Sequence, residues 1–422
     1  MTVQDLQYAE SNEQSETILT SYQDKTTLEF TPDAVGDYLI LAVAEIQGTS
    51  TSYDAKARLL IGASIYQELI YRVKDVSDWY PFCALKRLNL SALTTIKIQW
   101  CTSNAGATAR IRNARIIAFK VPSQYNEAET RTTTTSTTYV DKVALTFTPI
   151  SAGDYLIIVT ANIDCASASY SVYARLLQDG SVVHNEALRE PGATSDRLTF
   201  ALIRKVTLTA ASHTFTVQYH AENASYAGGI GYAHIVAIRL DEFLNSYYNE
   251  VEAQSSPAAA NTWYDKVTVS YTPQNGAHLV LGSIMQTSAS TTQSVGARLN
   301  LNGSVVHDTL VEAKDTTDYD AIFLFSKADL IAESRVDKIQ YMGEGTGTKV
   351  KSARIVSLQL TVITIIETIT AKNFPMLYLS KPITGQELKS KVEGATITKV
   401  ANDFPLELLK EGKGKELKSK WS

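Results

Sequence analysis

The stretch LEFTPDAVGDYLILAVAE, residues 28–45, decides the fold because the chain uses it repeatedly. It returns as LTFTPISAGDYLIIVTAN at 145–162 and, more altered, as VSYTPQNGAHLVLGSIMQ at 269–286. Each copy joins an apolar run, a Thr-Pro, a glycine position and a second apolar run. Proline cannot donate to a strand ladder, and glycine suits the bend that follows. Each copy therefore predicts a strand, a corner and a second strand.

Other anchors recur in the same order around this stretch. An Asp-Lys pair follows an aromatic residue, and an Ala-Arg-Leu comes after the second apolar run. Equivalent anchors are 117 to 124 residues apart, which indicates a repeated domain rather than a short solenoid unit. We expect domains at 1–121, 122–242 and 243–361. The structural anchors are Asp24, Pro32, Gly36 and Arg58; Asp141, Pro149, Gly153 and Arg175; and Asp265, Pro273, Gly276 and Arg298.

Inside one copy the apolar residues alternate with polar ones, as in TTLEFTP (26–32) and TIKIQW (95–100). This period of two is typical of strands with one buried and one wet face. Turn signals such as PDAVGD and LNGS separate about seven or eight such runs in each copy. The sequence therefore predicts an all-β fold of three tandem antiparallel jelly-roll β-sandwiches.

Composition limits the classes of function. The 422 residues are 44% apolar and 20% charged, with a net charge of -5, and no basic run precedes residue 360. We therefore expect no nucleic-acid partner. We also expect no membrane span, and no secretory signal at MTVQDLQYAESNEQ. Three cysteines cannot form a disulfide framework; we expect them unpaired, with a Cys83–Cys101 bridge as the alternative.

The last part of the chain differs from the copies. Residues 362–422 contain two short related units, NFPMLYLSKPITGQELKSK and DFPLELLKEGKGKELKSK. A piece this small cannot bury a large core, so we expect a docking or assembly module. The β-branched segment 361–370, TVITIIETIT, is expected to pair within its own chain. The alternative is that it completes the sheet of a neighbouring molecule.

Chemistry-bearing patterns are sparse. The six histidines include no HxH or HExxH set, so we expect strand or surface roles, even for His184 and His307, which occupy matching places. The string GGIGY at 228–232 lacks the lysine and helix of a phosphate loop, and we interpret it as a hairpin loop. We expect no catalytic residues and no cofactor.

Two residue classes leave an alternative open. Loop aspartates can supply hard oxygen ligands to calcium, but aspartate also favours turns, which is the preferred interpretation. Tyrosines can be strand residues or partners for sugars and proteins, and the sequence does not separate these roles. The calcium candidates are Asp75, Asp78, Asp315, Asp318 and Asp320. The tyrosines in or beside loops include Tyr53, Tyr80, Tyr125, Tyr170, Tyr173, Tyr226, Tyr247 and Tyr248.

The repeated FTP..AGDYLI...A......S..ARL pattern, LTAASHTFTVQYHAENASYA and the closing AHIVAIRL strand resemble jelly-roll modules of phage and phage-like virion proteins. Their general architecture is similar to TNF/C1q-type heads. The resemblance covers residues 1 to about 361.

The resemblance implies a non-enzymatic virion subunit of the fibre, spike or capsid- or tail-decoration type. It further implies a homo-oligomer, often a trimer in this family, with a host-surface glycan as one kind of partner. We expect the terminal module to contact other capsid or tail proteins. The alternatives are a carbohydrate-binding surface protein and a subunit of an extracellular filament.

Overall fold

The computed structural model describes residues 3–312 and 315–360, which belong to one compact unit. Within these ranges the regular structure is β-strand, apart from one 3-10 turn, η1 (Leu240–Glu242). No helix in them is long and apolar enough to cross a membrane. The predicted all-β fold class is confirmed. The predicted module 362–422 and the segment 361–370 lie outside the described residues.

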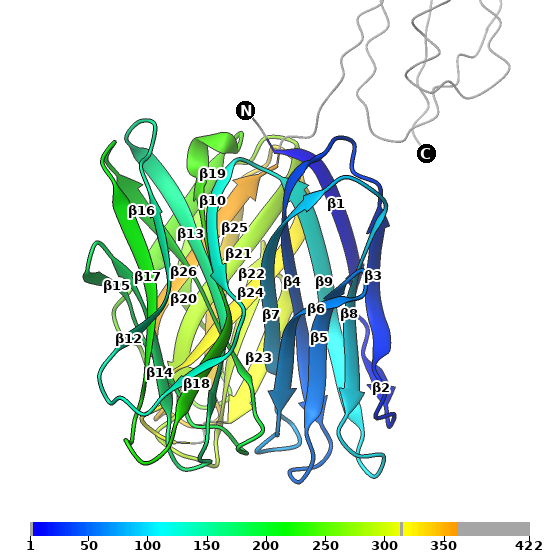
Figure 1. Cartoon of the computed structure of the whole chain (residues 1–422), viewed down its shortest axis with the longest axis vertical. Coiled ribbons are helices and arrows are strands. Elements are labelled where there is room, and N and C mark those ends of the chain that lie inside the picture. Colours follow the sequence, from blue (N-terminus) through cyan, green and yellow to red (C-terminus); the bar gives the residue numbers. More distant parts are fainter. Residues whose placement is uncertain (1–2, 313–314, 361–422) are drawn as a thin grey trace, which may run out of the picture. The chain divides into compact units, whose positions relative to one another are not determined.

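Jelly roll 1 consists of two antiparallel sheets (Figure 1). Their strand orders are β1-β9-β4-β7, with β2 also paired to β9, and β3-β8-β5-β6. If the short β2 is left out, eight strands remain in chain order. The sheet β1-β9-β4-β7 then contains strands one, eight, three and six of these eight, which is the order of a jelly roll. The strands are β1 (Gln4–Ser11), β2 (Ser15–Thr17), β3 (Gln23–Phe30), β4 (Gly36–Gly48), β5 (Ala55–Ile61), β6 (Ser64–Tyr71), β7 (Tyr80–Leu90), β8 (Thr94–Thr102) and β9 (Ala109–Lys120).

Jelly roll 2 has the same strand order. Its sheets are β10-β18-β13-β16, with β11 also paired to β18, and β12-β17-β14-β15. The strands are β10 (Ser123–Ala128), β11 (Thr132–Thr134), β12 (Val140–Phe147), β13 (Gly153–Cys165), β14 (Val172–Gln178), β15 (Ser181–Arg189), β16 (Leu198–Leu208), β17 (His213–Ala221) and β18 (Gly228–Arg239).

Jelly roll 3 repeats this order with sheets β19-β26-β21-β24 and β20-β25-β22-β23. The strands are β19 (Ser246–Val251), β20 (Tyr264–Tyr271), β21 (Gly276–Thr287), β22 (Ser294–Leu301), β23 (Ser304–Glu312), β24 (Asp320–Leu330), β25 (Arg335–Gly343) and β26 (Lys349–Gln359). Because all three jelly rolls lie in one compact unit, the domain boundaries given above stay predictions.

Burial follows the predicted period in one sheet but not in the other. In β3, Leu28 and Phe30 are buried while Thr27 and Glu29 are exposed. In β4, every residue from Tyr38 to Gly48 is buried. Within that strand Leu41 and Val43 are fully buried although they lie outside the hydrophobic core cluster. The second face of β4 is therefore covered as well, and the expectation of one wet face fails for this sheet.

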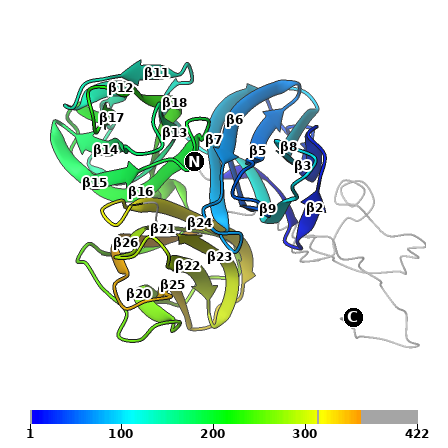
Figure 2. The ribbon, with the colours of Figure 1, turned by 90° about the horizontal axis from the view of Figure 1, so that it is seen from below.

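The three sheets that contain β7, β16 and β24 face one another, and we call them the inner sheets. These three strands contact each other. Isolated bridges add to the contact, joining Ile70 to Arg197 and Trp79 to Leu310. Figure 2 shows the three jelly rolls grouped around these strands. We call the contact regions seam 1–2, seam 2–3 and seam 3–1, after the jelly rolls that they join.

The string GGIGY lies at the start of β18, so the hairpin-loop interpretation was wrong. The strand contains a bulge there: its register against β13 shifts between Thr160 and Asn162, and Tyr232 has a φ of 47°. A Cβ at Gly229 would lie 2.4 Å from the Asp164 carboxylate, so this glycine makes room for a side chain on the paired strand. Tyr232 precedes Ala233, and Asn113 and Ser352, which precede the equivalent Ala114 and Ala353, have the same left-handed backbone.

Candidate functional site: the seams between the jelly rolls

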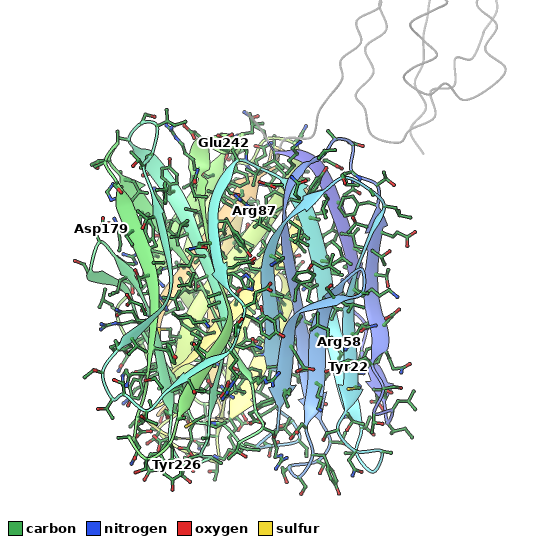
Figure 3. The ribbon with its side chains drawn as sticks, in the orientation of Figure 1. Tyr22, Arg58, Arg87, Asp179, Tyr226 and Glu242 are labelled. Atoms are coloured by element: carbon green, nitrogen blue, oxygen red, sulfur yellow. The ribbon has the colours of Figure 1, made fainter. Side chains whose placement is uncertain are left out.

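The recurring aspartate and arginine anchors meet on the outer sheet of each jelly roll. In jelly roll 1, Gln99 donates to Asp24 at 2.6 Å and accepts from Arg58 at 2.8 Å. The Arg58 guanidinium lies 3.8 Å over the Tyr22 ring, and both residues are labelled in Figure 3. These contacts connect β3, β8 and β5. The equivalent sets are Asp141, Gln218, Arg175 and Tyr139, and Asp265, Gln340, Arg298 and Trp263.

The proline and glycine anchors lie at the corner between the first two strands of each repeated stretch. Strand β3 ends at Phe30, two residues before Pro32, and β4 begins at Gly36. The proline follows the strand end by two residues in the other two copies as well, but the third copy reaches its glycine one residue sooner. Their anchors are Pro149 and Gly153, at the corner from β12 to β13, and Pro273 and Gly276, at the corner from β20 to β21.

One buried aspartate from each jelly roll reaches across a seam. Asp78 accepts hydrogen bonds from the Glu312 backbone N–H at 2.9 Å and from the Ser294 hydroxyl at 3.3 Å. Asp318 accepts from the Glu190 N–H at 2.7 Å and from the Ser171 hydroxyl at 2.8 Å. Each aspartate therefore holds the loop of the next jelly roll in the same way.

The third seam completes the ring with a variation. Asp196 accepts from the Arg72 backbone N–H at 3.1 Å. Where the other seams have a serine, this one has Asp54, which accepts a hydrogen bond from the Ser195 hydroxyl at 3.3 Å. Asp78 binds jelly roll 3, Asp318 binds jelly roll 2 and Asp196 binds jelly roll 1, so the contacts close into a cycle.

Burial governs the protonation of these three carboxyls. Desolvation raises the pKa of Asp78 and of Asp196 to about 7, although backbone N–H donors oppose the change. The pKa of Asp318 rises to about 6 for the same reason. The nearby carboxylate of Asp54 also raises the pKa of Asp196.

The calcium candidates do not converge in one place. Asp75 and Asp315 accept hydrogen bonds from Ser77 and Thr317 two residues onward, which is an Asx-type turn. Asp320 forms an ion pair with Arg189 across seam 2–3. Asp78 and Asp318 direct their oxygens at N–H and O–H donors. Calcium binding at these two loops stays a prediction. The hydrogen-bond donors do not favour it, because a calcium ion would need the carboxylate oxygens that already accept from them.

A second set of seam contacts joins cations to carboxylates. The Lys86 ammonium lies 2.6 Å from Glu127 and 2.6 Å from Glu129 across seam 1–2. Arg204 pairs in the same way with Glu250 and Glu252 across seam 2–3. We call Lys86 with its two glutamates the lysine clamp.

The two glutamates of the lysine clamp, together with His234, have the composition of a metal site. Glu127, Glu129 and His234 place ligand atoms within 4.8 Å of one another. Burial opposes the charge on Glu127, but hydrogen bonds from His234, Lys86 and Tyr125 outweigh burial and lower its pKa to about 2. The Lys86 ammonium already supplies the positive charge that these carboxylates require.

Cation–π contacts occur at all three seams. Arg87 lies 5.3 Å from the Tyr125 ring centroid, Lys205 lies 5.9 Å from that of Tyr248, and Lys327 lies 5.8 Å from that of Tyr8. Figure 3 labels Arg87 on its inner-sheet strand β7. Of the tyrosines considered from the sequence, Tyr125 and Tyr248 are thus seam residues, and Tyr80 is buried.

The two matching histidines are buried in the seams. The His184 Nδ1 accepts a hydrogen bond from the Arg354 guanidinium at 2.6 Å, and His307 lies 3.2 Å from the Glu45 carboxylate. Burial and neighbouring arginines hold the pKa of both imidazoles well below the usual value. The residue that matches them in jelly roll 1 is Gln67, which pairs with Leu59 as the histidines pair with Leu176 and Leu299.

An alignment on the turn glycines would instead match Tyr66 to these histidines. Each of these hairpins has a two-residue turn that contains one glycine. In the β5–β6 turn the glycine is the first residue, Gly62. In the β14–β15 and β22–β23 turns it is the second residue, Gly180 and Gly303. Aligning the glycines therefore shifts the comparison by one residue. Gln67 donates to Asn162 at 2.7 Å across seam 1–2.

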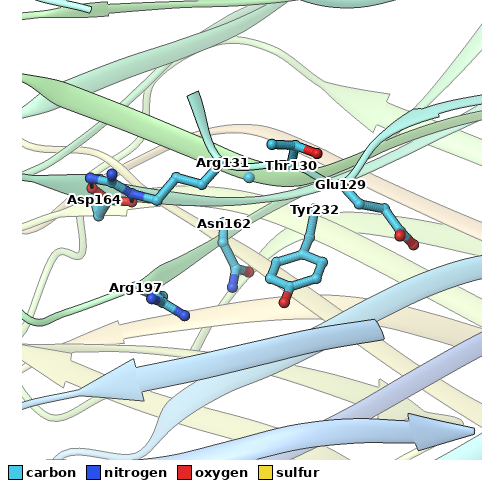
Figure 4. A pocket seen from close by; sticks show the side chains of 8 residues that line it. Glu129, Thr130, Arg131, Asn162, Asp164, Arg197 and Tyr232 are labelled. Carbon is cyan, nitrogen blue, oxygen red and sulfur yellow. Dashed lines mark hydrogen bonds and ion pairs between the residues drawn. The ribbon is translucent and has the colours of Figure 1, made fainter. Parts of the chain in front are cut away.

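A pocket of about 240 Å³ opens at seam 1–2 (Figure 4). Arg131 pairs with Asp164 along one wall, and Arg197 pairs with Glu68 at 3.0 Å. In the close view Asn162 and Tyr232 lie in the middle, with Asp164 and Arg197 on one side and Glu129 on the other. The pocket is lined by Glu129, Thr130, Arg131, Asn162, Asp164, Arg197, Gly231 and Tyr232.

The three cysteines, Cys83, Cys101 and Cys165, are free and buried, so the alternative Cys83–Cys101 bridge does not form. Burial raises the pKa of all three thiols.

Comparison with known proteins gives distant similarities alone. No family model matches the chain, and no curated protein matches it. A Paenibacillus xanthan lyase is 12% identical with a TM-score of 0.20, and the match covers 63% of this chain but 30% of the lyase.

Two virus structures are also similar. Particles derived from infectious bursal virus are 8% identical with a TM-score of 0.22, covering 78% of this chain and 72% of theirs. A triple-jelly-roll protein from an archaeal virus turret is 9% identical with a TM-score of 0.19, covering 84% of this chain and 91% of its own. All three TM-scores are low.

Proposed function

We propose that this protein is a non-enzymatic structural subunit of a virion, of the fibre, spike or capsid- or tail-decoration type. The observation that carries the proposal is the cycle of Asp78, Asp318 and Asp196, which joins three jelly rolls of equal topology into one unit. The resemblance of the repeated segments to virion jelly-roll modules points in the same direction.

The physical advantage of such a unit lies in assembly. Separate jelly rolls lose translational and rotational freedom when they associate, a cost of about 4–15 kcal/mol for each association. A chain that carries all three meets less of this cost, because its linkers hold the partners close. The seams then fix the orientation of the three outer sheets, which is what a particle subunit needs in order to present a defined surface.

In this proposal residues 362–422 dock the subunit to other capsid or tail proteins, and the subunit assembles as a homo-oligomer. The test is immunogold electron microscopy with antibody against residues 1–360, applied to particles purified from the cells that produce the protein. We expect gold on the particles. Label confined to free protein or to long filaments would overturn the proposal.

Docking through the terminal module has a separate test. A chain ending at residue 360 is expected to keep the circular dichroism spectrum of an all-β protein and to lose its attachment to particles. Attachment that survives the truncation, or a truncated chain that does not fold, would refute docking by 362–422.

A carbohydrate-binding surface protein is the second candidate function. The observation that favours it is the polar pocket at seam 1–2, which contains an aromatic ring, guanidinium groups and carboxylates. Glycan binding is compatible with a virion subunit, because host attachment commonly uses surface sugars. The electron microscopy described above tests the virion role, and glycan binding needs its own measurement.

A further inference from the structure

The pocket at seam 1–2 lies where the other two jelly rolls have a filled contact. Jelly rolls 1 and 3 have a long cationic side chain at the same place in their last strand. These residues are Arg112, two before Ala114, and Lys351, two before Ala353. The Arg112 guanidinium lies 4.1 Å over the Trp79 ring and donates to the Glu45 carboxylate at 2.6 Å. The Lys351 ammonium lies 3.7 Å over the Tyr319 ring. In both places a side chain of the chain itself occupies the space.

Jelly roll 2 differs at all three corresponding positions. Gly231 stands where Arg112 stands, Arg197 replaces the Trp79 ring, and Asn162 replaces the Glu45 carboxylate. All three replacements line the pocket. The loss of the cation is therefore matched by loss of the ring and the carboxylate that held it. Such a coordinated change leaves a space suited to a different occupant.

The charges around the pocket balance. Its lining contains the carboxylates of Glu129 and Asp164 and the guanidinium groups of Arg131 and Arg197. Arg131 is already paired with Asp164, and Arg197 with Glu68. A free anion or cation would have to compete with these pairs. A neutral ligand with hydroxyl groups can donate to the carboxylates and accept from the guanidinium groups without breaking them.

Tyr232 gives the pocket an aromatic surface. The bulge of β18, with its φ of 47°, holds this side chain at the seam. Burial raises the pKa of the Tyr232 phenol, so the hydroxyl stays protonated at neutral pH and can both donate and accept. Within residues 3–312 and 315–360 this hydroxyl has no hydrogen-bond partner. An apolar ring with a polar end matches the two kinds of surface of a sugar.

We propose that the pocket at seam 1–2 binds one ring of a neutral saccharide. The pocket has a volume of about 240 Å³. About eight water molecules occupy this volume in the liquid, at ~30 Å³ each, and a single sugar ring is of a similar size. The proposal rests on the second candidate function, carbohydrate binding, and names its site and ligand class. It does not depend on the virion role. Glycan binding that is unchanged in Gly231→Arg would overturn this site and leave carbohydrate binding elsewhere on the protein standing.

The matched experiment uses Gly231 in the full chain. A Cβ at this position would lie 3.4 Å from its nearest neighbour, an ordinary contact, so Gly231→Ala is expected to fold normally. Gly231→Arg restores the residue of jelly roll 1 and fills the pocket. A printed array of neutral, sialylated and sulfated glycans identifies a binder, and calorimetry with that glycan measures its affinity for each variant.

We expect binding to neutral glycans, retained within about twofold by Gly231→Ala and weakened about tenfold or more by Gly231→Arg. Tyr232→Phe removes a single hydroxyl and is expected to weaken binding about fivefold, a second readout if Gly231→Arg does not fold. Circular dichroism checks folding in each case. Absence of glycan binding, binding to charged glycans alone, or affinities unchanged in Gly231→Arg and Tyr232→Phe would overturn the proposal.

Discussion

Asp78 and Asp75 lie three residues apart in one loop, yet they have different roles. Asp78 is fully buried and accepts hydrogen bonds from jelly roll 3, whereas Asp75 bonds to Ser77 in its own turn. A buried N–H that loses its acceptor costs about 1–3 kcal/mol, whereas an exposed turn group can bond to water instead. Sequence pattern alone treats the two aspartates alike.

Asp78→Ala is therefore expected to lower the free energy of unfolding by about 1–3 kcal/mol, because the Glu312 N–H and the Ser294 hydroxyl lose their acceptor. Asp75→Ala is the matched control and is expected to cost less than about 1 kcal/mol. Urea denaturation at fixed pH measures both. Equal losses for the two variants would contradict a special role of the seam aspartate.

The seam aspartates also predict a dependence on pH. The pKa of Asp196 is about 7 in the folded protein against an ordinary value of 3.8, so the folded state binds more protons between these values. Stability contributed by this group is therefore present at low pH and lost as pH rises toward 7. Neutral histidines in the seams act in the opposite direction, so the comparison needs a variant.

Asp196→Asn removes this titration and leaves the histidines in place. We expect the stability of wild type minus that of the variant to fall as pH rises from 5 to 8. Chemical denaturation at several pH values over this window measures the difference. A difference that stays constant, or that grows with pH, would show that the Asp196 carboxyl is ionised throughout.

At the scale of elements, β7 supplies both a strand of jelly roll 1 and a surface for jelly roll 2. Lys86 on this strand has 4% of its side chain exposed, and its ammonium meets Glu127 and Glu129 of jelly roll 2. The exposed strand pair Lys97–Asp24 has the same 2.6 Å separation but far more solvent contact. The two ion pairs therefore differ in interaction energy although their distances are equal, because water screens the Lys97–Asp24 pair.

Lys86→Met is expected to destabilise the protein by about 1–3 kcal/mol, since it leaves two partly exposed carboxylates without their cation. Lys97→Met serves as the matched control and is expected to cost less than about 1 kcal/mol. Thermal denaturation at low and moderate salt measures both changes. The prediction fails if the two substitutions have the same effect, or if added salt abolishes the difference.

At the scale of the whole molecule, the seams couple the three jelly rolls. Residues 3–312 and 315–360 belong to one compact unit, with polar contacts at every seam and inner-sheet strands that contact one another. If one seam is broken, the other two seams still connect every jelly roll to a neighbour. Two broken seams leave one jelly roll joined by its linkers alone.

The chain 1–360 is therefore expected to unfold in one cooperative transition, monitored by tryptophan fluorescence and circular dichroism together. Asp78→Ala combined with Asp196→Ala weakens both seams of jelly roll 1 and is expected to separate its unfolding from that of the other two. Coincident transitions in the double variant would mean that coupling does not depend on these aspartates.

Much of this organisation could be predicted because local rules determine it. Alternation in β3, the Thr-Pro corner and the glycine that begins β4 depend on neighbours within a few residues, so the all-β class follows from the sequence. The aspartate and arginine anchors were visible as a pattern. That they meet through Gln99 depends on strand order, which the pattern alone did not give.

The candidate site depended on contacts that lie far apart in the chain. Asp78 and Glu312 are 234 residues apart. A loop aspartate is readily explained by its preference for turns, so the sequence does not indicate this hydrogen bond. GGIGY was taken for a loop because glycines usually mark turns, whereas here they make room for Asp164 and for the pocket at seam 1–2. A comparison of Gly231 with Arg112 and Lys351 was the one signal in the sequence that could have indicated the pocket.

The sequence by itself determined three copies of one sandwich, because strand period, proline and glycine act over short distances. Only the tertiary structure decided which faces are buried, since a second covered face on β4 and the seam carboxyls depend on where neighbouring jelly rolls lie. The same reason separates Asp78 from Asp75 and Gly231 from Arg112. Each pair is alike in its local position and differs in what the rest of the chain brings against it.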